Sequence, residues 1–151
     1  MTELEHVYQS IHDKNIAVYN LHFSPTIKSM CVCAAEESII LDKNAIETQK
    51  EEIEIITHEI THIETGNTYC VTSTSNTRLA RANRNFYEAK TERATIRKLL
   101  PPEKLQRAIF NVGCEYRRIA DYCNRTLDFV KKAFNYYETI GIQFELPEYS
   151  Y

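Results

Sequence analysis

One segment, His58-Glu59-Ile60-Thr61-His62, limits the folds open to this chain more than any other. On an α-helix, residues i and i+4 lie about 40° apart on one face, so both imidazoles can reach a single ion. The carboxylate of Glu59 then points to the side of that ion, where a reacting water molecule would lie. The segment therefore predicts a helix that carries a zinc site, with His58 and His62 as ligands and Glu59 as the general base.

The residues around this motif favour a buried helix. Isoleucines recur at spacings of three and four residues on the face opposite the histidines: Ile53, Ile56, Ile60 and Ile63. Such a stripe predicts that a hydrophobic core anchors the helix. The alternative is an amphipathic helix that carries two solvated histidines by chance.

Composition indicates an ordinary globular domain. The chain has 151 residues, of which 43% are hydrophobic and 26% charged. It shows neither a signal peptide nor an apolar run long enough to cross a bilayer, so a cytoplasmic location without membrane contact is expected. An odd number of cysteines without C-x-x-C spacing indicates reduced thiols. They are Cys31, Cys33, Cys70, Cys114 and Cys123.

Charge is distributed unevenly along the chain. Residues 1–77 carry 4 basic and 12 acidic side chains, a net charge of -8, whereas residues 78–151 carry 14 and 9, a net charge of +5. The basic half could bind an acidic protein or nucleic acid, although solvated helix faces often produce the same bias.

Patterning along the chain predicts an α+β fold that is mainly helical. The first half is expected to hold a helix at 2–12 entered through Thr2, strands at 16–23, 27–34 and 38–41, and the metal helix, capped by Asp42 or Asn44 and ended by Gly66. After a loop at 65–77, helices are expected at 80–100, 102–110, 115–123 and 127–137.

A catalytic zinc needs a third protein ligand. The metzincin spacing is excluded because Thr68 stands where the third histidine would be needed. Glu64 projects roughly 200° away from His62, off the metal face. The helix at 80–100 offers Glu88 and Glu92, which stand one turn apart, and these considerations leave either one as the ligand.

The string from Tyr87 to Ala94, running on to Leu99-Leu100-Pro101 after an H-E-x-x-H helix, resembles the ImmA/IrrE family of metallopeptidases. In that family the third ligand lies thirteen residues before the proline that closes the helix. The resemblance therefore implies Glu88 as the metal ligand and Glu92 as its neighbour. The chain departs from the pattern at Thr91 and Thr95, where alanine is usual, and at Ile60-Thr61, where a glycine is often found.

The resemblance also implies a domain organisation. Residues 1–101 would form a zincin-like metallopeptidase core, and residues 102–151 a helical segment packed on the same domain. Within that segment, residues 117–123 and 129–137 look like a helix-turn-helix-like pair. The apolar residues of the pair recur at helical spacing and are expected to be mainly core: Phe129, Val130, Ala133, Phe134 and Tyr137.

The function expected on these grounds is zinc-dependent hydrolysis of a peptide bond, with Glu59 passing a proton to the leaving amine. By resemblance, the substrate would be a specific regulator, typically a phage or mobile-element repressor that binds DNA. Tyr69, Tyr87 and Arg84 are candidate oxyanion donors. The alternative is a Zn²⁺-binding regulatory or DNA/protein-binding module, an antirepressor or toxin-antitoxin component, with little catalysis. Glu59 argues against it, because a structural zinc site has no use for a general base.

Overall fold

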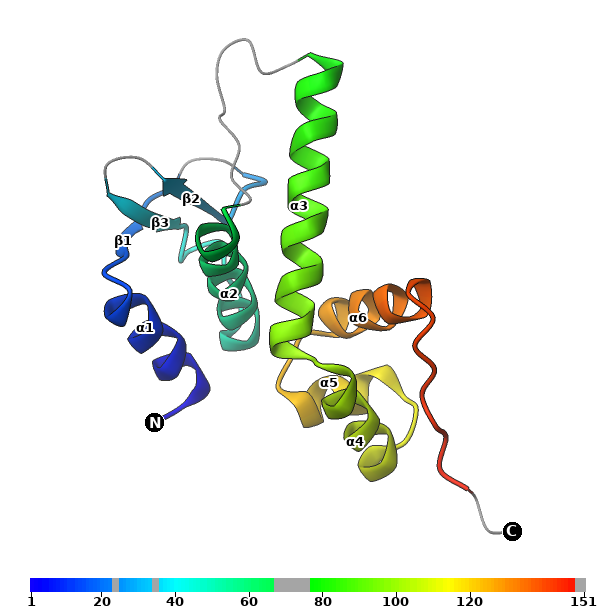
Figure 1. Ribbon diagram of the computed structural model, residues 1–151. Helices are drawn as coiled ribbons and strands as arrows, with labels where there is room; N and C mark the ends of the chain where they lie inside the picture. The colour runs from blue at the N-terminus through cyan, green and yellow to red at the C-terminus, as the bar shows by residue number, and fades with distance from the viewer. Residues whose placement is uncertain (23–24, 34–35, 67–76, 149–151) are drawn as a thin grey trace. The chain divides into compact units, whose positions relative to one another are not determined.

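The structure, a computed structural model, describes residues 1–22, 25–33, 36–66 and 77–148. Along them lie α1 (Glu3–Asp13), β1 (Ala17–Asn20), β2 (Ser29–Cys33), β3 (Glu37–Leu41), α2 (Gln49–Thr65), α3 (Arg78–Leu99), α4 (Pro102–Val112), α5 (Tyr116–Cys123) and α6 (Leu127–Thr139) (Figure 1). The predicted α+β class, mainly helical with a small three-stranded N-terminal sheet, is confirmed.

The chain forms two compact units, Met1–Thr95 and Ile96–Tyr151. The predicted organisation into residues 1–101 and a segment packed on the same domain stays a prediction. The predicted strand ends at Phe23 and Ala34, together with Cys70 and most of the predicted loop at 65–77, lie outside the described residues.

The first unit is built on a mixed sheet of order β1-β3-β2. The central strand β3 pairs parallel with β1 and antiparallel with β2, in the register Ser29↔Leu41 and Cys31↔Ile39. Helix α2 packs on β2 and β3, and α1 lies beside α2 (Figure 1). Their shared core consists of Ile11, Ile16, Ile39, Leu41, Ile56 and Ile60. Of the predicted isoleucine stripe, Ile56 and Ile60 belong to this core, Ile63 packs against it, and Ile53 is buried, so the stripe is confirmed as the buried face of α2.

Helix α2 is buried despite its polar residues because several of them bond to their own helix. The hydroxyls of Thr57, Thr61 and Thr65 each donate to the backbone carbonyl four residues earlier, at 2.7, 2.7 and 2.6 Å. Hydroxyls bonded in this way can leave water without the cost of an unsatisfied polar group. The helix ends at Gly66, whose φ of 66° is the predicted left-handed cap.

The predicted cap at the start of α2, Asp42 or Asn44, is wrong. Thr48 is the N-cap: its backbone is extended, and its Oγ1 accepts a hydrogen bond from the backbone N–H of Glu51 at 3.1 Å. Asp42 is buried and lies 2.6 Å from the Nδ1 atom of His22 instead. Residues 43–47 form the connection that the sequence pattern assigned to the helix.

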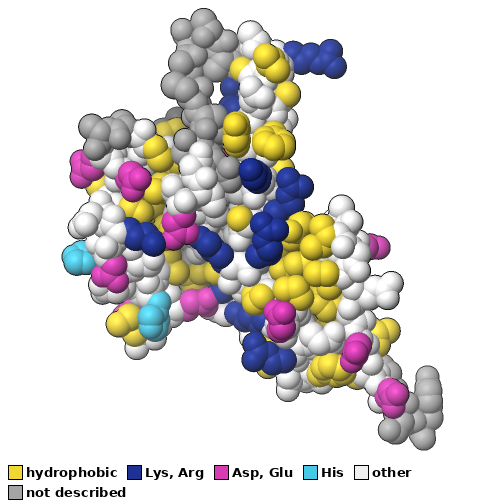
Figure 2. All heavy atoms as spheres, in the orientation of Figure 1, with side chains coloured by type: hydrophobic (Ala, Val, Ile, Leu, Met, Phe, Trp, Pro, Cys, Tyr) yellow, Lys and Arg dark blue, Asp and Glu magenta, His cyan; other side chains and the backbone are white. Residues whose placement is uncertain are grey.

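The basic excess of the C-terminal half lies on α3. This helix carries seven Lys and Arg against two Glu, a net charge of +5, and several of the basic side chains appear in dark blue over α3 in Figure 2. Residues 100–151 carry seven basic and seven acidic side chains and are neutral as a set. The charge that suggested an acidic partner is therefore not a property of the C-terminal helices.

The second unit is a cluster of three short helices, α4, α5 and α6. The prediction that the apolar residues of α6 are core is confirmed: Phe129, Val130, Ala133 and Tyr137 are buried, and Phe134 packs against them. Tyr137 donates from its hydroxyl to the backbone carbonyl of Leu100 at 2.7 Å, and burial raises its pKa to about 12. The described tail is tied to α4 by paired bonds between the side-chain amide of Gln106 and the backbone of Glu145.

Within the part of the chain that the structure describes, no helix combines the length and the apolar character needed to span a bilayer.

The Thr48 cap gives a test of the corrected start of α2. Replacing Thr48 with Ala removes the acceptor for the Glu51 N–H, and it should lower the free energy of unfolding by about 1 kcal/mol. Asn44→Ala is the matched control and should change stability by less than about 0.5 kcal/mol, as expected at an exposed surface position. Urea denaturation followed by circular dichroism measures both, and an equal loss in the two variants would contradict the assignment.

Candidate metal centre

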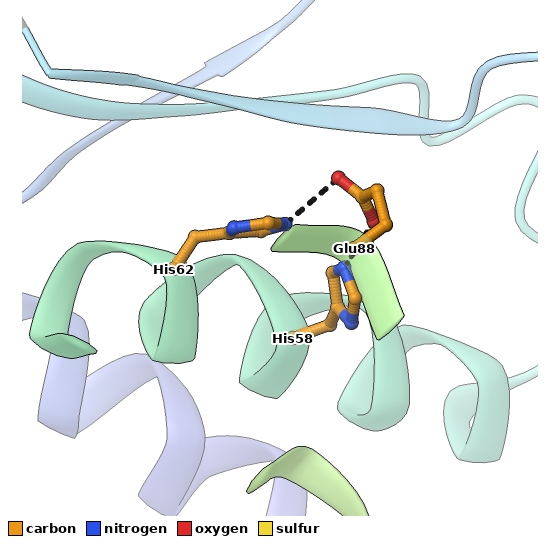
Figure 3. Close-up of side chains that lie close together, drawn as sticks. All are labelled: His58, His62 and Glu88. Atoms are coloured by element: carbon orange, nitrogen blue, oxygen red, sulfur yellow. Dashed lines mark hydrogen bonds and ion pairs between the residues drawn. The ribbon is translucent and has the colours of Figure 1, made fainter. Parts of the chain in front are cut away.

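Two helices of the first unit bring three potential metal ligands together. His58 and His62 stand one turn apart on α2, and Glu88 reaches them from α3 (Figure 3). The Nε2 atom of His58 lies 3.0 Å from Oε2 of Glu88, and the Nε2 atom of His62 lies 3.0 Å from Oε1. The two imidazole rings are nearly perpendicular, with centroids 4.7 Å apart. One carboxylate thus faces two ring nitrogens that converge on the same point.

The cluster is closed on one side and open on the other. The His62 side chain is 4% exposed, whereas those of His58 and Glu88 are 23% and 40% exposed. A pocket of about 350 Å³ adjoins the cluster. The described residues that line it are His58, Asn85, Glu88, Ala89 and Glu92. The alternative of two solvated histidines is wrong for His62, which is buried.

The donor set fits a divalent transition metal. Tetrahedral zinc with ligands at about 2.0–2.2 Å holds neighbouring donor atoms about 3.4 Å apart. One donor atom from each of the three residues lies within 4.8 Å of the other two, and each oxygen of Glu88 lies 3.0 Å from the Nε2 atom of one histidine, so the spacing is close to that of a zinc site. Two imidazoles, one carboxylate and an open side form the pattern of catalytic rather than structural zinc sites. Other first-row divalent ions accept the same donors.

Glu59 lies next to the cluster along α2 but faces the sheet. It is 5% exposed, and its Oε1 accepts a hydrogen bond of 2.5 Å from the hydroxyl of Ser29 on β2. Cys31, two residues further along the strand, also lies beside this carboxylate, and burial together with the charge of Glu59 raises the pKa of its thiol. Cys31 therefore stays a neutral thiol at ordinary pH. Glu59 is therefore held apart from the three potential ligands.

The two carboxylates of α3 occupy different places. Glu88 belongs to the group with both histidines, and Glu92 lines the neighbouring pocket without belonging to that group. The spacing of the two residues alone left them equivalent.

Three polar residues near the centre were missed by the sequence analysis. They are Ser29, Asn85 and Thr91, whose Oγ1 lies 3.1 Å from the Nδ1 atom of His62. The signal for the last two was their position three residues before and after Glu88, which puts them on its face of α3. Among the predicted oxyanion donors, Tyr69 lies outside the described residues. Tyr87 packs edge-on against Phe86, and neither it nor Arg84 lines the pocket.

Comparison of the chain with protein-family models, with curated proteins and with solved structures finds no match.

Metal analysis of ligand variants tests the centre. The parent protein should bind one equivalent of zinc, and His58→Ala and Glu88→Ala should each weaken binding more than about 100-fold, beyond the loss usual for an outer hydrogen bond. Glu92→Ala is the matched control and should retain the full equivalent. Elemental analysis with titration calorimetry measures this, and zinc loss in Glu92→Ala alone would assign the third ligand to Glu92.

Zinc should also stabilise the folded protein. A ligand that binds only the native state at 100 times its dissociation constant adds about 2.7 kcal/mol to the free energy of unfolding. The melting temperature should therefore rise with zinc in the parent protein and stay constant in His58→Ala. Magnesium is the matched ion control, because it prefers oxygen ligands and octahedral geometry. An equal rise with both ions would contradict a nitrogen-rich site.

Proposed function

We propose that this protein is a zinc-dependent endopeptidase that hydrolyses a peptide bond in a specific regulatory protein. The observation that supports it is the convergence of His58, His62 and Glu88 beside an open pocket, with Glu59 next to them on the same helix. A structural metal site needs four protein ligands and no general base, whereas the described residues of this one offer three ligands and a neighbouring carboxylate.

Each residue has a role in this proposal. A zinc ion, when bound, would supply a Lewis acid that acidifies water and polarises the carbonyl of the scissile bond. His58, His62 and Glu88 would hold the ion. Glu59 takes the proton from the attacking water and delivers it to the leaving amine. Among the described residues of the pocket, Asn85 alone carries a neutral amide that can donate a hydrogen bond to a developing oxyanion.

The proposed mode of substrate binding is strand addition along β2. This strand pairs with β3 on one side, and no other described strand pairs with its second edge. An extended peptide can hydrogen-bond to such an edge. The inner face of β2 contacts Glu59 through Ser29, so a peptide on this edge would run close to the proposed base. The ImmA/IrrE resemblance favours a repressor-type transcription regulator of a phage or mobile element as the substrate.

The second candidate is a zinc-binding regulatory module with little catalysis. The observation that favours it is the Ser29 hydroxyl bonded to a buried Glu59, since a carboxylate bonded in this way can also serve only to join β2 to α2. Direct DNA binding through α5 and α6 gains no support from charge, because the basic excess lies on α3 and residues 100–151 are neutral as a set.

Glu59→Gln separates the two candidates. Glutamine keeps the size and the hydrogen bonding of the side chain but cannot accept the proton, so hydrolysis should fall by at least about 100-fold while zinc affinity is retained. The zinc-loaded parent and variant would be incubated with heparin-bound proteins of a bacterial extract, a fraction enriched in DNA-binding regulators. Mass spectrometry of newly formed N-termini reads out the cleavage.

Cleavage at a small number of sites that needs both zinc and Glu59 would support the endopeptidase. Enrichment of these sites in the heparin-bound fraction over the unbound fraction would support a DNA-binding regulator as the substrate. Full zinc binding without any Glu59-dependent cleavage in either fraction would favour the zinc-binding regulatory module over the endopeptidase.

A further inference from the structure

The two ring nitrogens of His62 are both contacted by α3. Its Nε2 atom lies 3.0 Å from Oε1 of Glu88, and its Nδ1 atom lies 3.1 Å from Oγ1 of Thr91. Glu88 and Thr91 are three residues apart and therefore share one face of the helix. Thr91 is 0% exposed and His62 is buried, so the second contact is shielded from water. Residues of one helix, α3, thus contact both ring nitrogens of this imidazole.

We propose that Thr91 is a positioning residue of the metal centre, whose hydroxyl fixes the tautomer and ring orientation of His62. The inference rests on the proposed function, since it concerns the residues that would hold the zinc ion. Thr91 stands outside the ligand set and would act only through His62.

The hydrogen-bonding needs of a ligating histidine explain why the Thr91 hydroxyl would fix the tautomer of His62. A neutral imidazole has one N–H, and a ligand that uses the lone pair of Nε2 must carry its proton on Nδ1. In a buried site that N–H needs an acceptor, because an unsatisfied buried donor costs about 1–3 kcal/mol. The Thr91 hydroxyl lies at hydrogen-bonding distance from Nδ1 and can accept from it. Loss of the hydroxyl would leave the metal-binding tautomer of His62 without this partner.

In the metal-free form, Nδ1 of His62 can have the opposite hydrogen-bonding role. If the Nε2 atom of His62 donates its proton to Glu88, Nδ1 becomes an acceptor, and the same hydroxyl can donate to it. A hydroxyl that can turn from donor to acceptor serves both tautomers without movement of the backbone. An alanine at this position would serve neither.

A neighbouring threonine provides a matched control. Thr95 is also buried on α3, one turn further along, but its hydroxyl donates to the backbone carbonyl of Thr91 at 2.9 Å. Replacement of either threonine by valine removes one buried hydroxyl and keeps the branched shape. The two substitutions therefore differ mainly in whether the lost hydroxyl contacts His62.

The experiment measures zinc affinity of the full chain by competition with a chromophoric chelator. Thr91→Val should weaken zinc binding by about 10–100-fold, the range found when the hydrogen-bond partner of a ligating histidine is removed. Thr95→Val should stay within about threefold of the parent, because its hydroxyl does not contact a ligand. Thr91→Ser restores the hydroxyl and should recover most of the affinity, a rescue that a purely structural role of the methyl group would not give.

Urea denaturation of the metal-free proteins separates affinity from stability. If Thr91→Val does not fold, Thr91→Ala removes the same hydroxyl without adding apolar volume and should show the same loss of affinity. Equal zinc affinity in the Thr91 and Thr95 variants, or no rescue by serine, would overturn the positioning role and leave the metal centre intact. Absence of zinc binding in the parent protein would instead overturn the proposed function itself.

Discussion

The carboxylate of Glu88, at 3.0 Å from the Nε2 atoms of both His58 and His62, is the contact on which the metal centre depends. It joins the middle of α3 to α2, two helices separated in the sequence by residues 66–77. The ring N–H of a histidine can donate to this carboxylate, or a bound cation can take the place of the protons between them. The same three side chains form the candidate metal centre.

Helix α2 contributes two residues to the candidate metal centre because its faces make different contacts. One face buries isoleucines in the core of the first unit, and another presents the two histidines to α3. The hydroxyls of Thr57 and Thr61 donate to backbone carbonyls of α2 itself, four residues earlier, so these hydrogen bonds are made within the helix. Glu59 turns toward β2 and is bonded by Ser29. The helix thus packs against the sheet on one side and presents the two histidines to Glu88 on another.

Local patterns in the sequence were sufficient to predict much of helix α2 and the end of helix α3. The spacing of the histidines, the isoleucine stripe, Gly66 and the prolines after α3 are features of single elements, and periodicity or backbone chemistry predicts them. The residues that were missed depend on contacts between elements. Ser29 and Thr91 lie 30 and 29 residues from the side chains that they bond. No local pattern marks Ser29, and the spacing of Thr91 from Glu88 places it on the same helix face without indicating a contact with His62. Likewise, Asp42 is not the cap of α2: it lies directly after β3, is buried, and contacts His22, which is 20 residues away in the sequence.

Helix α3 is continuous from Arg78 to Leu99, although the division between the two compact units falls between Thr95 and Ile96. It carries Glu88 of the candidate metal centre and Thr91, which contacts His62. Its Ile96, and Leu100 directly after the helix, belong to the core of the second unit. A fragment that ends at the prolines after α3 would carry these two apolar side chains without the residues that bury them. Such an uncovered helical end favours aggregation. A fragment truncated after α3 would therefore tend to aggregate, even though it retains His58, His62 and Glu88.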